Sequence, residues 1–81
     1  MLRAIVSKRV IDRLIREKLK QVPVCDGITA LPVVWRQRLG AECNWEIPGW
    51  VGEAHSIARC SYQIGAFVRS LESQFDIADE A

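Results

Sequence analysis

The sequence predicts an α+β fold in which two helices flank a β-hairpin, in the order helix, strand, strand, helix (αββα). Three observations lead to this class. Apolar residues recur at three- and four-residue spacing in two stretches, two short tryptophan-bearing runs lie between them, and turn-forming residues mark the junctions. A chain of 81 residues, 49% apolar and 26% charged, suits one small globular unit, so we expect residues 1–81 to form a single domain.

The first helix is expected over residues 8–21. Ser7 can cap its start and Pro23 ends it. Residues 1–7 are either the start of this helix or a short extended arm, which could add a strand to a sheet in this chain or in a neighbouring subunit. The apolar residues that fall on one helical stripe are Val10, Ile11, Leu14, Ile15, Leu19 and Val22.

The outer face of the first helix is basic. Residues 1–20 hold seven basic and two acidic side chains, whereas residues 21–81 hold four basic and eight acidic ones. The net charge of +1 is therefore the sum of a positive N-terminal segment and a negative remainder. Asp12 and Glu17 lie four residues from a basic partner, which is typical of a solvated helix face. The side chains that could instead lie along nucleic-acid phosphates are Arg9, Arg13, Arg16 and Lys20.

A hairpin is expected from residues 33–38 and 43–47, after a connecting loop at 22–31. Placing Trp35 opposite Trp45 sorts the side chains into two faces, because side chains alternate along a strand. The inner face then holds Val33, Trp35, Gln37, Cys43, Trp45 and Ile47. The solvated outer face holds Val34, Arg36, Arg38, Glu42, Asn44 and Glu46, with complementary charges across the pair.

The second helix is expected over about residues 53–75, with Glu53 favourably placed near its positive end. Residues 50–52 should form an exposed corner before it, and 76–81 an acidic, frayed tail after it. The seven-residue repeat of Ile57, Ile64 and Leu71 fits an ordinary core face better than a coiled-coil seam, because it is short. A close crossing of another element would explain Gly65 within this helix.

Three cysteines at positions 25, 43 and 60 are an odd and sparse set, so we expect buried thiols in a reducing cytoplasm. A zinc site would need a close ligand pair such as Cys-x-x-Cys, which the chain lacks, and we expect no metal and no cofactor. Charged residues interrupt every apolar stretch, so we expect no membrane partner.

The sequence has no catalytic motif: it lacks a nucleophile motif and a glycine-rich phosphate loop, and its one histidine, His55, lies five residues from Cys60, away from it on a helix. We therefore expect a non-catalytic module that binds a protein, as an adaptor, regulator or inhibitor. The alternative is a nucleic-acid-binding regulator that uses the basic helix. A homodimer is also expected, because a two-stranded ribbon alone is marginal in water.

The protein-binding surface is expected on the hairpin and the corner that follows it. Loops and sheet edges carry recognition when helices carry the core. Trp50 should be the most exposed of the three tryptophans, although folding back over the hairpin is equally compatible with the sequence. The residues of this expected surface are Trp50, Arg36, Arg38 and Glu46.

Overall fold

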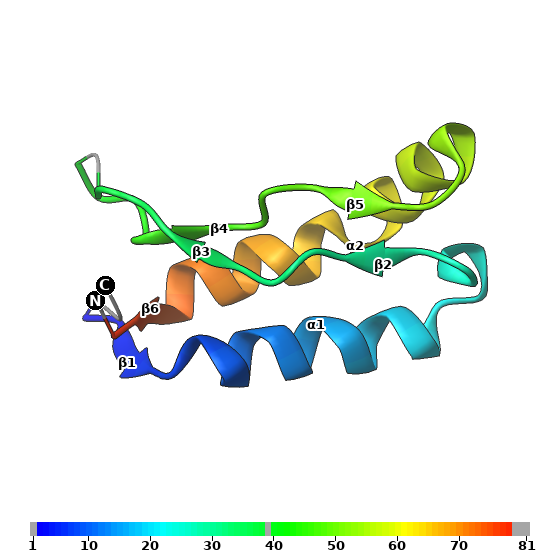
Figure 1. Ribbon diagram of the computed structural model, residues 1–81. Coiled ribbons are helices and arrows are strands. Elements are labelled where there is room, and N and C mark those ends of the chain that lie inside the picture. Colours follow the sequence, from blue (N-terminus) through cyan, green and yellow to red (C-terminus); the bar gives the residue numbers. More distant parts are fainter. Residues whose placement is uncertain (1, 39, 79–81) are drawn as a thin grey trace.

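The computed structural model describes residues 2–38 and 40–78. It contains the helices α1 (Lys8–Gln21) and α2 (Ala54–Gln74), the 3-10 helix η1 (Pro23–Cys25), and the strands β1 (Ala4–Val6), β2 (Thr29–Ala30), β3 (Val34–Trp35), β4 (Trp45–Glu46), β5 (Trp50–Val51) and β6 (Phe75–Ile77). The predicted α+β class is confirmed. Figure 1 shows that the two helices run in opposite directions and that β2 to β5 form a long hairpin beside them.

Helix α1 begins and ends where the sequence predicts. The Ser7 hydroxyl accepts a hydrogen bond from the Arg9 N–H (3.3 Å), which satisfies one of the free donors of the first turn. Pro23 follows the Val22 cap and begins η1 instead of continuing the helix. The apolar stripe faces the core through its buried members Ile11, Ile15 and Leu19.

The hairpin is longer than predicted but keeps the predicted register. Trp35 pairs with Trp45 as expected, and β2 pairs with β5 further from the turn. Partners in both ladders are equidistant in sequence from Gly40, so the two ladders belong to one hairpin. The interruption falls where Pro32 and Pro48 are opposite in this register, since neither residue has an N–H to donate.

The side of the hairpin that faces the core changes at this interruption. Near the turn, the odd-numbered Val33 and Trp45 are buried and the even-numbered Glu46 is exposed. Beyond the prolines the even-numbered Trp50 packs against the core and Val51 is exposed. A strict two-residue alternation cannot describe the whole hairpin, because a two-stranded ribbon twists strongly and the prolines break its ladder.

Three predictions about this region are corrected. The loop at 22–31 contains η1 and β2, and the corner at 50–52 begins with β5. Of the two placements that the sequence left open for Trp50, the structure has the one packed back against the core, with the side chain half-buried. Trp35, placed on the inner face by alternation, is 49% exposed, because the rest of the fold covers its partner Trp45 and leaves Trp35 at the surface.

Helix α2 spans nearly the predicted range, and its apolar face packs internally. Glu53 caps it, with carboxylate oxygens that accept from the backbone N–H groups of His55 (3.0 Å) and Ser56 (2.9 Å). These hydrogen bonds, first the one from His55, lower the pKa of Glu53 below its ordinary value. Gly65 does not mark a close crossing, since an added Cβ there would meet only the side chain of Arg69.

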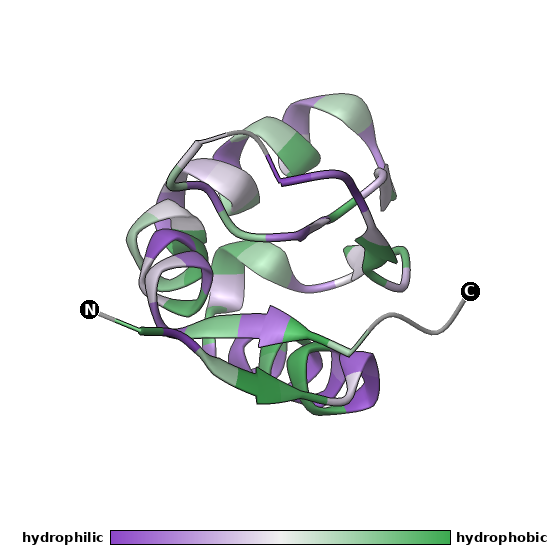
Figure 2. Ribbon diagram, turned by 90° about the vertical axis from the view of Figure 1, so that its left-hand side faces the viewer, coloured by the Kyte–Doolittle hydropathy of each residue, from purple (hydrophilic) through white to green (hydrophobic). Residues whose placement is uncertain are grey.

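The N-terminal residues form a strand within this chain. Strand β1 pairs in parallel with β6, with Ala4 beside Phe75 and Val6 beside Ile77, and both strands appear side by side in Figure 2. The expected frayed tail is thus wrong over residues 76–78, because Asp76 and Ile77 are buried in β6 and the Ala78 N–H donates to the Val6 carbonyl (3.0 Å). The remainder of that prediction at 79–81 lies outside the described residues.

The hairpin is attached to β6 by Asn44. Its side-chain amide donates to the Ile77 carbonyl (2.9 Å) and accepts from the Ile77 N–H (2.8 Å), as a neighbouring strand would. The Asn44 N–H donates to the buried carboxylate of Asp76 (3.2 Å). Asn44, predicted to be solvated, therefore joins the hairpin to the terminal strands.

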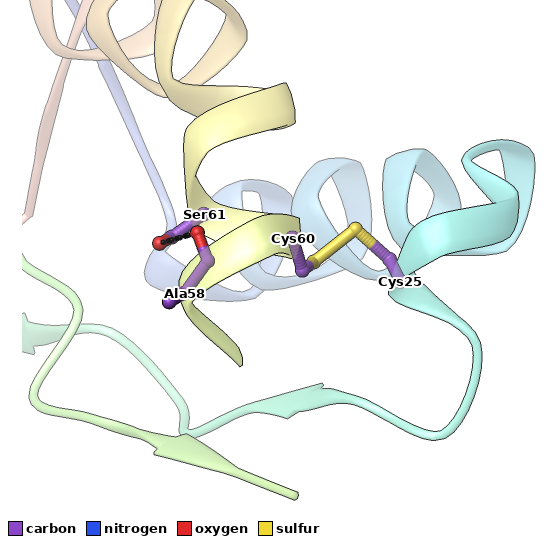
Figure 3. Close-up of a disulfide and its surroundings, with 4 residues drawn as sticks. All are labelled: Cys25, Ala58, Cys60 and Ser61. Carbon is purple, nitrogen blue, oxygen red and sulfur yellow. Dashed lines mark hydrogen bonds between the residues drawn. A yellow bond between two sulfur atoms is a disulfide. The ribbon is translucent and has the colours of Figure 1, made fainter. Parts of the chain in front are cut away.

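A disulfide joins Cys25 of η1 to Cys60 of α2, as Figure 3 shows. The expectation of three buried thiols is right about burial and wrong about the chemistry of this pair. Cys43 is free and buried, and its thiol donates to the Trp45 carbonyl. The expected cytoplasmic location rested on free thiols and loses that basis, since disulfides persist mainly in oxidising compartments.

Candidate functional site

Arg38, expected on the recognition surface, binds within the molecule. Its guanidinium forms an ion pair with Asp76, whose side chain is 7% exposed. Because a buried carboxylate is costly unless it is paired and hydrogen-bonded, this contact serves the attachment of the hairpin to β6. Arg38 therefore lies apart from the other three residues of the expected surface.

Arg36, Glu46 and Trp50 do come together. They line a cleft of about 390 Å³ between α2 and the second strand of the hairpin, with Gly65 on the helix side. Arg36 already has partners there: its Nε donates to the Cys43 carbonyl (3.4 Å) and its guanidinium lies 3.5 Å from a carboxylate oxygen of Glu42. This cleft is lined by side chains of both charges, and one of its two arginines, Arg36, already has partners within the chain.

The first strand of the hairpin carries exposed apolar side chains instead. Leu31 and Val34 are each 40% exposed and Trp35 is 49% exposed. They come from residues 31–35 of the first strand, and none of the three lines the cleft. Sequence reasoning placed Val34 on the solvated face but missed the other two, because alternation put Trp35 inside and Leu31 was expected in a loop.

A larger hollow opens beside this strand. It occupies about 570 Å³ between the C-terminal half of α1, η1 and β2, and we call it the basic groove. Two of the elements that line it, the end of α1 and β2, lie opposite each other in Figure 1. Its apolar lining includes Ile15, Leu19, Val22, Ile28, Leu31 and Pro32, and its charged lining comprises Asp12, Arg16, Lys20 and Asp26.

The four basic residues predicted on α1 are all exposed, and two of them, Arg16 and Lys20, border the basic groove. Asp12, which lies four residues before Arg16 on the helix, forms its hydrogen bond with the hairpin. Asp12 accepts a hydrogen bond from the Val33 N–H (2.8 Å) and so fixes the hairpin to α1. Lys18 is also engaged, with its ammonium 5.3 Å from the centre of the Phe67 ring.

The groups considered for catalysis and metal binding lie apart or are occupied. His55 is exposed at the start of α2, and Cys60 is closed in the disulfide. Within residues 2–38 and 40–78, no three side chains of the His, Cys, Asp and Glu types gather to hold a metal ion. Nor does either helix, over the part of the chain that the structure describes, have the length and apolar content to cross a membrane.

No protein-family model, curated protein or solved structure matches this chain. Its function is therefore inferred from its own surface.

Proposed function

We propose that the chain is a non-catalytic protein-interaction module, an adaptor, regulator or inhibitor of a larger protein. Its contact surface combines Leu31, Val34 and Trp35 of the hairpin with the basic groove beside them. The observation that carries the proposal is the exposure of three apolar side chains, Leu31, Val34 and Trp35, on the first strand of the hairpin, where Leu31 also lines an apolar-walled hollow.

Exposed apolar side chains are informative when they gather beside a hollow. A single exposed leucine is ordinary, whereas a contiguous patch with polar surroundings is typical of a binding surface. Tryptophan is enriched among the residues that dominate interface energies, since it buries a large area with few rotatable bonds. Trp35 would supply this anchor, with Leu31 at the border of the groove.

The surface expected from the sequence, with Trp50, Arg36, Arg38 and Glu46, is less suited to a partner. Arg36 and Arg38 are both in ion pairs within the chain, and Trp50 already packs against the core. A partner that used these arginines would first have to break those pairs. We therefore place the principal contact on residues 31–35 of the first strand of the hairpin.

Site-specific photo-crosslinking in the source cell tests this proposal. A benzophenone amino acid in place of Trp35 should capture a discrete protein, and nuclease treatment should leave the product unchanged. The control position is Tyr62, which is 86% exposed on α2. Capture from both positions alike, or a product lost after nuclease treatment, would contradict a protein contact at this surface.

Nucleic acid is the second candidate, favoured by the exposed side chains of Arg9, Arg13, Arg16 and Lys20 on α1. Phosphate binding by this stripe should weaken steeply with salt. We expect only weak, non-specific binding to a DNA or RNA duplex, because Glu17 is exposed on the same helix. Submicromolar binding at physiological salt, abolished by Arg13→Ala with Arg16→Ala, would favour nucleic acid over protein.

A further inference from the structure

We infer that the basic groove binds an acidic segment of the protein partner that carries one large apolar side chain. The apolar side chain enters the groove, and neighbouring carboxylates pair with Arg16 and Lys20. This inference rests on the proposed function, because it names the chemical class of the partner for the same surface.

The groove has the walls that an apolar anchor requires. Ile15, Leu19 and Ile28 are almost completely buried, so they form a fixed floor that a ligand meets without rearrangement. The disulfide partner Cys25 lines the η1 end and joins it covalently to α2. A large aliphatic or aromatic side chain would therefore gain burial in a hollow that is already formed.

The charge beside the groove decides which segment fits. Helix α1 holds six basic and two acidic residues, and one of the two, Asp12, accepts from the hairpin backbone. Arg16 and Lys20 stand exposed at the groove, and Arg9 and Arg13 continue the same exposed stripe toward the start of α1. A segment with several carboxylates is complementary to this stripe over about 16 Å of helix length.

The acidic members of the lining set the orientation of the segment. Asp26 caps η1 at the other end of the groove and is exposed. Carboxylates of the partner should therefore lie over α1 and not over η1, since like charges repel. An acidic segment would thus extend from the groove along α1, away from Asp26.

A defined peptide tests the inference. The probe is a fluorescein-labelled nonapeptide of glutamate residues with one central leucine, and its binding is measured by fluorescence anisotropy. Two control peptides replace the leucine by serine or the glutamates by lysine. We expect the leucine peptide to bind at least tenfold more tightly than either control, and its affinity to fall as salt is raised.

Matched variants locate the binding. Arg16→Glu with Lys20→Glu should weaken the acidic peptide at least tenfold, whereas Arg59→Glu with Arg69→Glu makes the same charge change on exposed positions of α2 and should have little effect. Leu31→Ser should weaken the leucine peptide but not the serine peptide. Circular dichroism melts verify that each variant is folded.

Each outcome has a defined meaning. Equal binding of the leucine and serine peptides, or equal loss in both double variants, would overturn the inference. Displacement of the peptide by a DNA duplex of higher affinity would assign the stripe to nucleic acid and would also overturn it. Protein capture from position 35 without peptide binding would leave the proposed function intact and refute only the acidic class of partner.

Discussion

The three tryptophans have different environments, although they lie within sixteen residues of sequence. Trp45 has no exposed surface, and its indole N–H donates to the Phe75 carbonyl (3.0 Å). Trp50 is half-buried, and Trp35 is half-exposed on the first strand of the hairpin. A tryptophan that satisfies its N–H in the core serves packing, whereas one that leaves its ring in solvent is available to a partner.

Replacing Trp45 should therefore destabilise the fold far more than replacing Trp35. Trp45→Ala removes a fully buried side chain, leaves a cavity, and should lower the free energy of unfolding by about 3–5 kcal/mol. Trp35→Ala should lower it by about 1 kcal/mol or less. Urea unfolding followed by circular dichroism measures both, and similar losses would contradict the assignment of Trp35 to the contact surface.

Glu53 should make the stability of the fold depend on pH in the acid range. Its pKa is lowered in the folded state, so its contribution is fully present above its ordinary value and is lost as the pH falls through the lower, folded value. Glu53→Gln should therefore reduce Tm at pH 6, and this difference should shrink as the pH falls below the ordinary pKa of glutamate. Glu17→Gln, at an exposed position in the interior of α1, is the control. A Tm difference that persisted unchanged at pH 3 would argue against a charged cap.

At the scale of elements, side chains hold the hairpin against the rest of the fold. Asp12 binds the Val33 N–H from α1, and Asn44 binds both backbone groups of Ile77 in β6. Arg3 of the N-terminal arm adds bonds to the carbonyls of Glu72 and Ala41, each 2.7 Å long. The short strands thus depend on polar side chains that supply hydrogen bonds beyond their own ladders.

Removing the Asn44 amide should loosen the junction between the hairpin and β6. Asn44→Ala leaves the N–H and carbonyl of Ile77 without these partners and should lower the free energy of unfolding by about 1–3 kcal/mol. Amide hydrogen exchange at Ile77 should accelerate in the same variant. Gln37→Ala, at an exposed hairpin position, is the control and should change neither quantity. Unchanged exchange at Ile77 in Asn44→Ala would show that β6 does not need this contact.

At the scale of the whole molecule, the core is small and is closed by a covalent link. The disulfide spans 35 residues of sequence and connects η1 to α2, on the side of the molecule where the basic groove opens. Closing a loop of this length restricts the unfolded chain more than the folded one. The link therefore matters both for stability and for the shape of the groove.

Opening this link should destabilise the fold. Cys25→Ser with Cys60→Ser should lower the free energy of unfolding by about 2–4 kcal/mol. The reductant dithiothreitol should lower Tm of the natural chain but not that of the double variant. Cys43→Ala, which leaves the disulfide intact, serves as the control for reductant sensitivity. If dithiothreitol left the Tm of the natural chain unchanged, that result would contradict a structural role for the disulfide.

The homodimer expected from the sequence rested on the marginal stability of a two-stranded ribbon alone in water. Within one chain the hairpin already packs against the helices through the buried Val33 and Trp45, although Trp35 stays half-exposed. The exposed apolar residues of the N-terminal arm, Leu2 at 98% and Ile5 at 74%, are the remaining basis for self-association. Sedimentation equilibrium tests it: a dimer requires a mass near twice 9.2 kDa that falls on dilution, and Ile5→Ser should weaken it. A mass of one chain at every concentration would rule the dimer out.

The sequence alone determined the features that depend on local order. The two helices follow from apolar spacing and terminal residues, as at Ser7 and Pro23, because helical hydrogen bonds join near neighbours. The hairpin register follows from the Trp35–Trp45 pairing across a short turn. Exposure of Arg9, Arg13, Arg16 and Lys20 follows from the same helical period that buries the opposite stripe.

Only the tertiary structure decided how distant residues meet. Spacing along the chain does not indicate that Cys25 bonds to Cys60, that Asp12 turns to the hairpin instead of Arg16, or that Asp76 is buried beneath Arg38. The basic groove likewise arises where α1, η1 and β2 converge, and no single segment contains it. The physical reason is that such contacts are fixed by how elements twist and pack together, which the period of one element does not specify.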